Sequence, residues 1–225
     1  MASSSDKVLH LRQLLAERFR PASLPREEAY STGLAALDEA GVPQAAITEI
    51  VSSVASGPGG SLLLFGLLHA AIGKGERIIL IDGKDAFAPK SLPCADLKRL
   101  LWTRCHDAWE AIKAADLAIR DGNFPLVILL LTLNPAAELR RIPAAVWHRL
   151  HMLAEKSAVT VLVFSPHAQV GCARLRVAVG GTFPLARLHR CRAELLPALH
   201  LQVERRRMSR ERRCDDEDLR RSACA

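Results

Sequence analysis

Apolar and polar residues follow two kinds of pattern along this chain. Mostly apolar runs of strand length occur at 45–51, 77–82, 124–133 and 159–164. Apolar residues at helical spacing occur between and beside them, at 61–72, 107–121 and 143–155. Apolar runs rich in branched residues indicate strands buried on both faces, and the helical spacing indicates amphipathic helices. This order of elements predicts an α/β domain, with a mostly parallel sheet flanked by helices.

The weaker patterns lie at the N-terminus, in the middle of the chain and towards the C-terminus. Residues 5–20 carry apolar residues at helical spacing, which predicts an N-terminal amphipathic helix within residues 1–25. Residues 96–101 fit a short strand or helix, and the alternation at 173–179 is typical of an edge strand. Residues 198–204 indicate a late strand. The predicted division is a helix in 1–25, the α/β domain in 26–204 and a charged C-terminal tail in 205–225.

Positive charge is concentrated near the C-terminus. The formal net charge of the 225-residue chain is +7, and residues 187–213 hold nine arginines and three glutamates, so 9 − 3 = +6 lies in that segment. Clustered arginines are suited to contact nucleic-acid phosphates, although a solvated tail would look similar. The candidate DNA-binding residues in or near this segment are Arg205, Arg206, Arg207, Arg210, Arg212 and Arg213.

Cysteine usage and hydropathy predict a cytoplasmic protein. The six cysteines form no CxxC pair and no zinc-finger spacing, which favours reduced thiols and no metal site. No apolar run reaches the ~20 residues that a membrane-spanning helix needs, and residues 1–20 lack a signal-peptide core. We therefore expect no membrane partner.

A glycine-rich turn separates the first predicted strand from an apolar helix. Strand, glycine-rich turn and helix in this order are typical of a phosphate-binding loop, where backbone N–H groups cradle phosphates. Such a loop normally has a lysine after its last glycine. Here Ser61 follows Gly60 directly, and residues 45–73 contain no lysine. The candidate nucleotide-binding residues of this degenerate loop, together with the acid that ends the second strand, are Gly57, Gly59, Gly60, Ser61 and Asp82.

Several short motifs in linear order resemble the ATPase core of the RecA family. They are Ser31-Thr32-Gly33 followed by Leu37-Asp38, the strand Ile47–Ile50, and the strand Ile78–Asp82 with its following acidic segment. The resemblance extends from Ser31 to about Phe164 and implies a RecA-like P-loop core. In recombinases of this family the region after the fourth strand holds a DNA-contacting loop, which adds Arg174 and Arg176 to the candidate DNA-binding residues.

The residues that the RecA family uses for hydrolysis have no counterparts in this chain. The nearest lysine to the loop is Lys74, beyond the intervening helix, and Lys84 stands where the resemblance places a water-activating glutamate. The central strand ends in the neutral residues 131–134 instead of an acid that supports magnesium. Phosphoryl transfer depends on such groups, so we expect a degenerate ATPase that requires no cofactor. Residual binding of ATP and magnesium stays open.

The glycine turn running into a leucine-rich helix, at 57–68, also resembles the ImuA (SulA/RecA-like) mutagenesis accessory proteins. That resemblance implies a role in the SOS response, in translesion synthesis and DNA repair. The implied partners are an ImuB-like polymerase-related protein, an error-prone DNA polymerase and single-stranded DNA, with RecA or a second copy as further candidates. It implies a cytoplasmic, nucleoid-associated protein.

Other interpretations remain beside this one. The chain could be an active DNA-dependent ATPase of recombinase type, or a SulA-like cell-division regulator that does not bind DNA. A dinucleotide site at Gly57–Gly59 with Asp82 fits poorly, because the third glycine position is Leu62. Three weaker candidates remain. His148 and His151 could bind a metal, and Asp82 and Asp85 could bind a cation. Ser165, near His167, could be a nucleophile.

Overall fold

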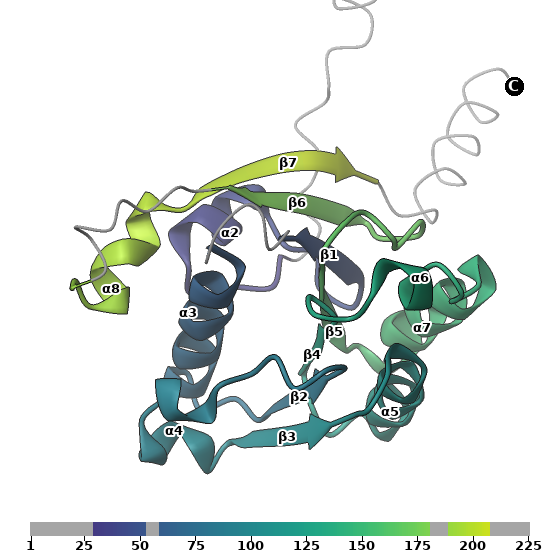
Figure 1. The fold of residues 1–225 in the computed structure, drawn as a ribbon, viewed down its shortest axis with the longest axis horizontal. Helices are drawn as coiled ribbons and strands as arrows, with labels where there is room; N and C mark the ends of the chain where they lie inside the picture. The colour runs from purple at the N-terminus through teal and green to yellow at the C-terminus, as the bar shows by residue number, and fades with distance from the viewer. Residues whose placement is uncertain (1–28, 53–58, 181–188, 208–225) are drawn as a thin grey trace, which may run out of the picture.

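A single seven-stranded sheet organises the computed structural model, which describes residues 29–52, 59–180 and 189–207 (Figure 1). The strand order is β3-β2-β4-β5-β1-β6-β7, and all neighbours are parallel except β6 and β7. The strand bounds are β1 Ile47–Val51, β2 Ile78–Asp82, β3 Leu100–Arg104, β4 Leu126–Leu130, β5 Thr160–Ser165, β6 Leu175–Gly180 and β7 His200–Arg206. The predicted α/β class and mostly parallel sheet are confirmed.

Helices cover both faces of the sheet. Figure 1 shows α3, α4 and α8 on one side, and α5, α6 and α7 on the other. Their bounds, with two 3-10 turns, are α2 Ala35–Ala40, α3 Gly59–Gly73, η2 Pro89–Ser91, α4 Cys94–Leu97, α5 Ala108–Asp121, α6 Ala136–Leu139, α7 Ala144–Ser157, α8 Arg192–Leu195 and η4 Leu196–Ala198. Each face of the sheet has its own hydrophobic cluster. Strand β4 lies between β2 and β5 and is buried along its whole length, as its apolar run predicts.

Helix α3 carries apolar residues on nearly all sides, and the structure accounts for this because other parts of the protein pack against two of its sides. One side packs on the sheet, and Leu34 and Leu196 pack against it from the other side. Gly66 allows this close approach, since a Cβ at that position would lie 2.7 Å from Leu196 Cδ2. The predicted helix at 61–72 is thus confirmed, and it is the middle layer between the sheet and an outer layer.

The motif at 31–38 forms a turn that docks on α3. The Asp38 carboxylate accepts hydrogen bonds from the Thr32 backbone N–H at 2.6 Å and its hydroxyl at 2.7 Å. Gly33 has a φ of 77°, and a Cβ there would lie 2.9 Å from Ala70 Cβ. These residues therefore hold a tight turn against α3, so their pattern has a structural explanation.

The predictions for residues 96–101 and 173–179 need correction. Residues 96–101 belong to two elements, because α4 ends at Leu97 and β3 begins at Leu100. The edge-strand prediction for 173–179 is wrong: β6 lies between β1 and β7, and its alternating burial arises because its outer residues are only partly covered. The predicted helix in 5–20 lies outside the described residues. None of the described helices is long and apolar enough to cross a membrane.

Candidate functional site

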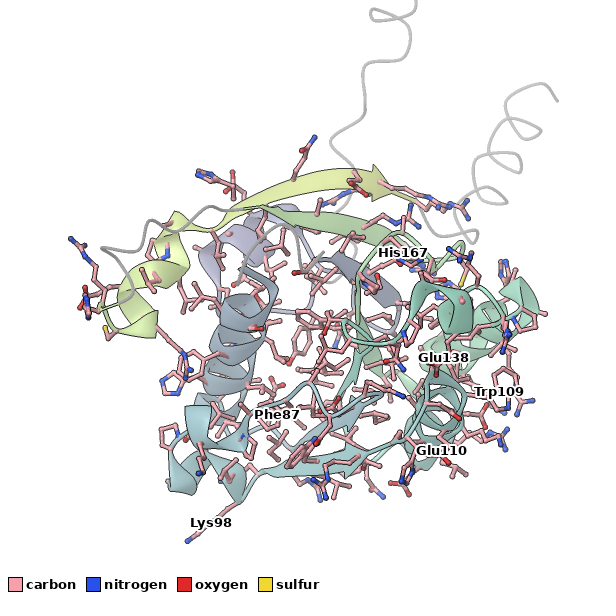
Figure 2. All side chains as sticks on the ribbon, in the orientation of Figure 1. Phe87, Lys98, Trp109, Glu110, Glu138 and His167 are labelled. Atoms are coloured by element: carbon pink, nitrogen blue, oxygen red, sulfur yellow. The ribbon has the colours of Figure 1, made fainter. Side chains whose placement is uncertain are left out.

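Asp82, at the carboxyl end of β2, uses its carboxylate to close its own loop. The side chain is fully buried. One carboxylate oxygen accepts hydrogen bonds from the backbone N–H groups of Lys84 at 3.2 Å and Ala86 at 2.9 Å. The other accepts from the N–H of Phe87 at 2.8 Å, on the α3 side of the sheet (Figure 2). A buried carboxylate with three such donors is already compensated, so Asp82 has a structural role in this loop.

Lys84 and Asp85, in the same loop, contact residues of β3 and of the connection that follows it. Lys84 Nζ donates to the carbonyl of His106 at 3.1 Å, so the cation that replaces the expected glutamate bridges to the start of α5. Asp85 has a φ of 56° and lies 3.6 Å from Arg104 Nη1. Both partners of that pair are largely exposed, so it contributes little to stability.

Asn134, after β4, connects three loops at this edge. Its Nδ2 donates to the Gly83 carbonyl at 3.0 Å and approaches Glu138 Oε1 at 3.4 Å. Glu138, in α6, also accepts from the backbone N–H of Ala108 at the start of α5 (Figure 2). Gly83 is necessary here, because a Cβ would lie 2.5 Å from Asn134 Oδ1. The residues after β2 and β4 therefore converge and hydrogen-bond to one another.

The start of α3 is closely packed. Gly59 and Gly60 are buried in its first turn, and Ser61 is exposed. A Cβ on Gly59 would lie 3.1 Å from Val179 Cγ1, and one on Gly60 would overlap the Ser52 hydroxyl. Gly57 lies outside the described residues. The close packing of the first turn therefore explains Gly60, while Gly59 is only tightly fitted against Val179.

Lys74 cannot take the place of the missing loop lysine. It follows the last residue of α3, and a 15-residue helix is roughly 22 Å long. Its Nζ donates to the Ser31 carbonyl at 2.6 Å and to the Ser31 hydroxyl at 2.9 Å. It therefore fastens the 31–38 turn to the opposite end of the helix.

The polar groups described at this edge are engaged mainly by neighbouring loops. Three backbone N–H groups donate to the carboxylate of Asp82, and the amide nitrogen of Asn134 donates to Gly83 and approaches Glu138. The sequence supplies no lysine at the start of α3. We therefore assign no catalytic step to these groups.

A buried ion pair that the sequence patterns do not indicate joins strands β1 and β6. Glu49 in β1 is fully buried, and its Oε2 lies 2.6 Å from Arg176 Nε in the neighbouring strand β6. Its other oxygen accepts from the Ser165 hydroxyl at 3.1 Å and from the N–H groups of Gln169 and Val170 at 2.7 and 3.0 Å. The only sequence signal for it is a glutamate inside an apolar strand.

This network explains two predicted residues. Arg176 also donates to the Val170 carbonyl at 3.1 Å, so its guanidinium is committed to Glu49 and the loop after β5. Ser165 is buried against Glu49, which gives it a structural role in place of a nucleophile. The segment from Ser165 to Val170 is thereby attached to the sheet at several points.

A second acidic side chain, Glu155 in α7, organises the neighbouring arginine. Arg174 Nη2 forms a short ion pair with Glu155 Oε1, and His151 Nε2 lies 3.4 Å from the same oxygen. Burial lowers the pKa of His151, with Arg174 and His148 acting in the same direction and Glu155 opposing them. His151 is thus part of a contact between α7 and the residue that precedes β6.

Three consecutive arginines end the described part of the chain. Arg206 Nη2 donates to the Ala40 carbonyl at the end of α2, and Arg205 Nη2 donates to the Gly171 carbonyl at 2.7 Å. The Arg207 backbone N–H donates to the Arg174 carbonyl at 2.6 Å. Strand β7 therefore extends to residue 206, two residues into the predicted tail. Arg210, Arg212 and Arg213 lie outside the described residues.

Comparison with models of known protein families gave no match, and a search of curated proteins gave none either.

Proposed function

We propose that this chain is a RecA-like accessory protein of SOS-induced translesion synthesis and DNA repair, similar to the ImuA proteins. It binds DNA and a polymerase-associated partner, and it does not hydrolyse nucleotide efficiently. The motifs at 31–38, 47–50 and 78–82 support the RecA-like part of this proposal, since they fall on the α3-docking turn, β1 and β2. The position of β1 inside a parallel sheet, followed by a glycine-rich entry into α3, is compatible with a degenerate P-loop core.

One observation carries the non-hydrolytic part of the proposal. At the carboxyl edge of the sheet, where α/β proteins bind ligands, Asp82 and Asn134 are engaged by the backbone of the adjacent loops. Lys84 is likewise turned to a carbonyl of the β3–α5 connection. Groups used in this way do not provide the free charges that stabilise a transferring phosphoryl group.

The DNA-binding part rests on the arginines at the end of β7 and in the sequence that follows. Six arginines occur within residues 205–213, with only Glu204 and Glu211 in or beside that stretch. Binding through such a segment would depend on phosphate charge more than on base identity. The amphipathic pattern in residues 5–20 suggests a contact with an ImuB-like protein, RecA or a second copy.

The nucleotide part is tested by measuring phosphate release from ATP with and without single-stranded DNA. The proposal predicts no turnover above background under either condition. A rate on the order of 1 s⁻¹ that Ser61→Ala or Gly59→Asp abolishes would instead establish an active DNA-dependent ATPase. Ser61 is exposed, so its substitution is the cleaner of the two controls.

The partner part is tested by co-purification with an ImuB-like protein and an error-prone polymerase. Deleting residues 1–25 should reduce the recovered partner while the far-ultraviolet circular dichroism and unfolding midpoint of the remaining chain are preserved. If the deletion abolishes folding, residues 1–25 belong to the core. If the full chain recovers neither partner and binds no DNA, the SulA-like alternative becomes the better account.

A further inference from the structure

Arg205 and Arg206 attach the end of β7 to two different parts of the protein. Neighbouring side chains of a strand point to opposite faces of the sheet. Arg206 reaches the Ala40 carbonyl in the layer that contains α2, and Arg205 reaches the Gly171 carbonyl in the loop between β5 and β6. The two guanidinium groups therefore hold the strand end from both faces.

The contact of Arg206 completes the end of helix α2. The last carbonyls of a helix lack partners within the helix, and a cation near them is favourable. Gly41 ends α2 with a φ of 66°, and a Cβ at that position would lie 3.2 Å from Arg206 Nη2. The guanidinium thus lies directly over the glycine that closes the helix. This position makes Arg206 part of the fold although its side chain is exposed.

Arg205 is held in a similar way on the other side. Its Nη2 donates to the Gly171 carbonyl at 2.7 Å. That carbonyl lies in the loop whose earlier residues are bound to Glu49. The pairing of β6 and β7 shifts register between Arg176 and Val177, directly beside this contact. Because such an irregularity weakens local pairing, a side-chain attachment at this point stabilises the strand end.

Arg207 differs from both of its neighbours. Its backbone N–H is fixed to the Arg174 carbonyl at 2.6 Å, but its side chain is exposed. In the part of the chain that the structure describes, that side chain forms no hydrogen bond or ion pair. Its charge is felt by Cys172, where burial raises the thiol pKa to about 11 and Arg207 partly opposes the rise.

We propose that Arg205 and Arg206 are anchoring residues that fix the end of β7, and that the side chain of Arg207 contacts nucleic-acid phosphate. The inference rests on the proposed DNA binding and divides the predicted arginine set by role. The anchors determine where the chain leaves the sheet, and the exposed side chain of Arg207 is available to a nucleic-acid backbone.

The test compares Arg205→Gln, Arg206→Gln and Arg207→Gln in the full chain, with Arg207→Lys as the charge-preserving control. Thermal unfolding and affinity for a labelled single-stranded oligothymidine are measured over a range of salt concentrations. The Arg205 and Arg206 variants should lower the unfolding midpoint by about 2–4 °C each and leave the salt slope unchanged. Arg207→Gln should leave the midpoint unchanged and make the slope shallower by about 0.7. Arg207→Lys should retain the wild-type slope.

The opposite pattern would overturn the assignment. A shallower slope at an unchanged midpoint for Arg205→Gln or Arg206→Gln would make that residue a phosphate contact, and an unchanged slope for Arg207→Gln would remove Arg207 from the interface. If the wild-type chain does not bind the oligothymidine, the proposed DNA binding and the role of Arg207 both fail. The unfolding midpoints still decide whether Arg205 and Arg206 are anchors.

Discussion

The carboxyl edge around β2 and β4 and the outer end of β6 and β7 use polar side chains in different ways. At the first, Asp82 accepts hydrogen bonds from the backbone of its own loop, and Asn134 donates to the backbone of that same loop after β2. At the second, five arginines (174, 176 and 205–207) lie close together, and among the described residues Glu155 pairs with Arg174 and Glu49 pairs with Arg176. Polar residues at a predicted ligand site can thus be used for hydrogen bonds within the fold, while an edge strand such as β7 can carry arginine side chains that are exposed to solvent.

The largest expected effect is a loss of stability when the buried ion pair between Arg176 and Glu49 is broken. Arg176→Met leaves the Glu49 carboxylate without its cation in a fully buried position, and should cost about 3–5 kcal/mol of unfolding free energy. Urea denaturation would measure it, and the double variant Glu49→Gln with Arg176→Met should recover part of the loss. Wild-type stability in Arg176→Met together with weaker DNA binding would return Arg176 to the DNA-contacting set.

A matched pair of glycine substitutions tests how closed the start of α3 is. Gly60→Ala introduces a methyl group into the Ser52 hydroxyl and should cost about 1–3 kcal/mol. Gly73→Ala, at the other end of the same helix, meets no neighbouring atom within 4 Å and should be neutral or stabilise by up to about 1 kcal/mol. Equal stability of the two variants would mean that the first turn of α3 has room for a ligand.

The loop after β2 can be tested through its carboxylate. Asp82→Asn places an amide against backbone N–H donors and should cost about 1–3 kcal/mol, measured by chemical denaturation. ATP affinity should not change, because the carboxylate serves the loop and not a ligand. Unchanged stability with a lower ATP affinity would show instead that Asp82 belongs to a nucleotide site.

The smallest expected effect is a pH dependence of stability that arises from His151, which contacts Glu155 in α7. The folded-state pKa of His151 is lowered by burial, so the unfolded chain binds more protons below its ordinary value of about 6.5. The contribution of His151 to stability is therefore fully present above that value and declines as the pH falls through it. The stability difference between wild type and His151→Gln should shift against the wild type between about pH 7.5 and about pH 5.5. A difference independent of pH would show that His151 titrates normally.

The sequence predicts the described elements well where a pattern is long. The apolar run at 124–133 and the helical spacing at 107–121 have only one simple structural solution, and β4 and α5 match them. The short segment at 96–101 does not, because four-residue α4 and five-residue β3 follow each other too closely to form separate patterns. The edge assignment at 173–179 failed because alternation reports how the two faces of a strand are buried, not whether both of its edges are paired. Strand β7 pairs with the edge of β6, while one face of β6 stays only partly buried.

The candidate sites show the limit of residue identity as evidence. The sequence identifies Asp82 as a candidate residue at the end of a buried strand. It does not show that Asp82 turns back on its own loop, because that depends on three backbone N–H directions. Arg176 could not be separated from Arg207 by sequence either, since the partner of Arg176 is Glu49, 127 residues earlier.

We propose that the arginine segment binds DNA with an affinity that does not depend on bound nucleotide. The most direct measurement is the affinity of the full chain for single-stranded DNA as a function of salt, with and without magnesium ATP. The account predicts a linear decrease of log affinity with log salt, with the same slope and the same affinity in both conditions. A salt slope near zero, or a change in affinity of about tenfold or more on adding magnesium ATP, would contradict it.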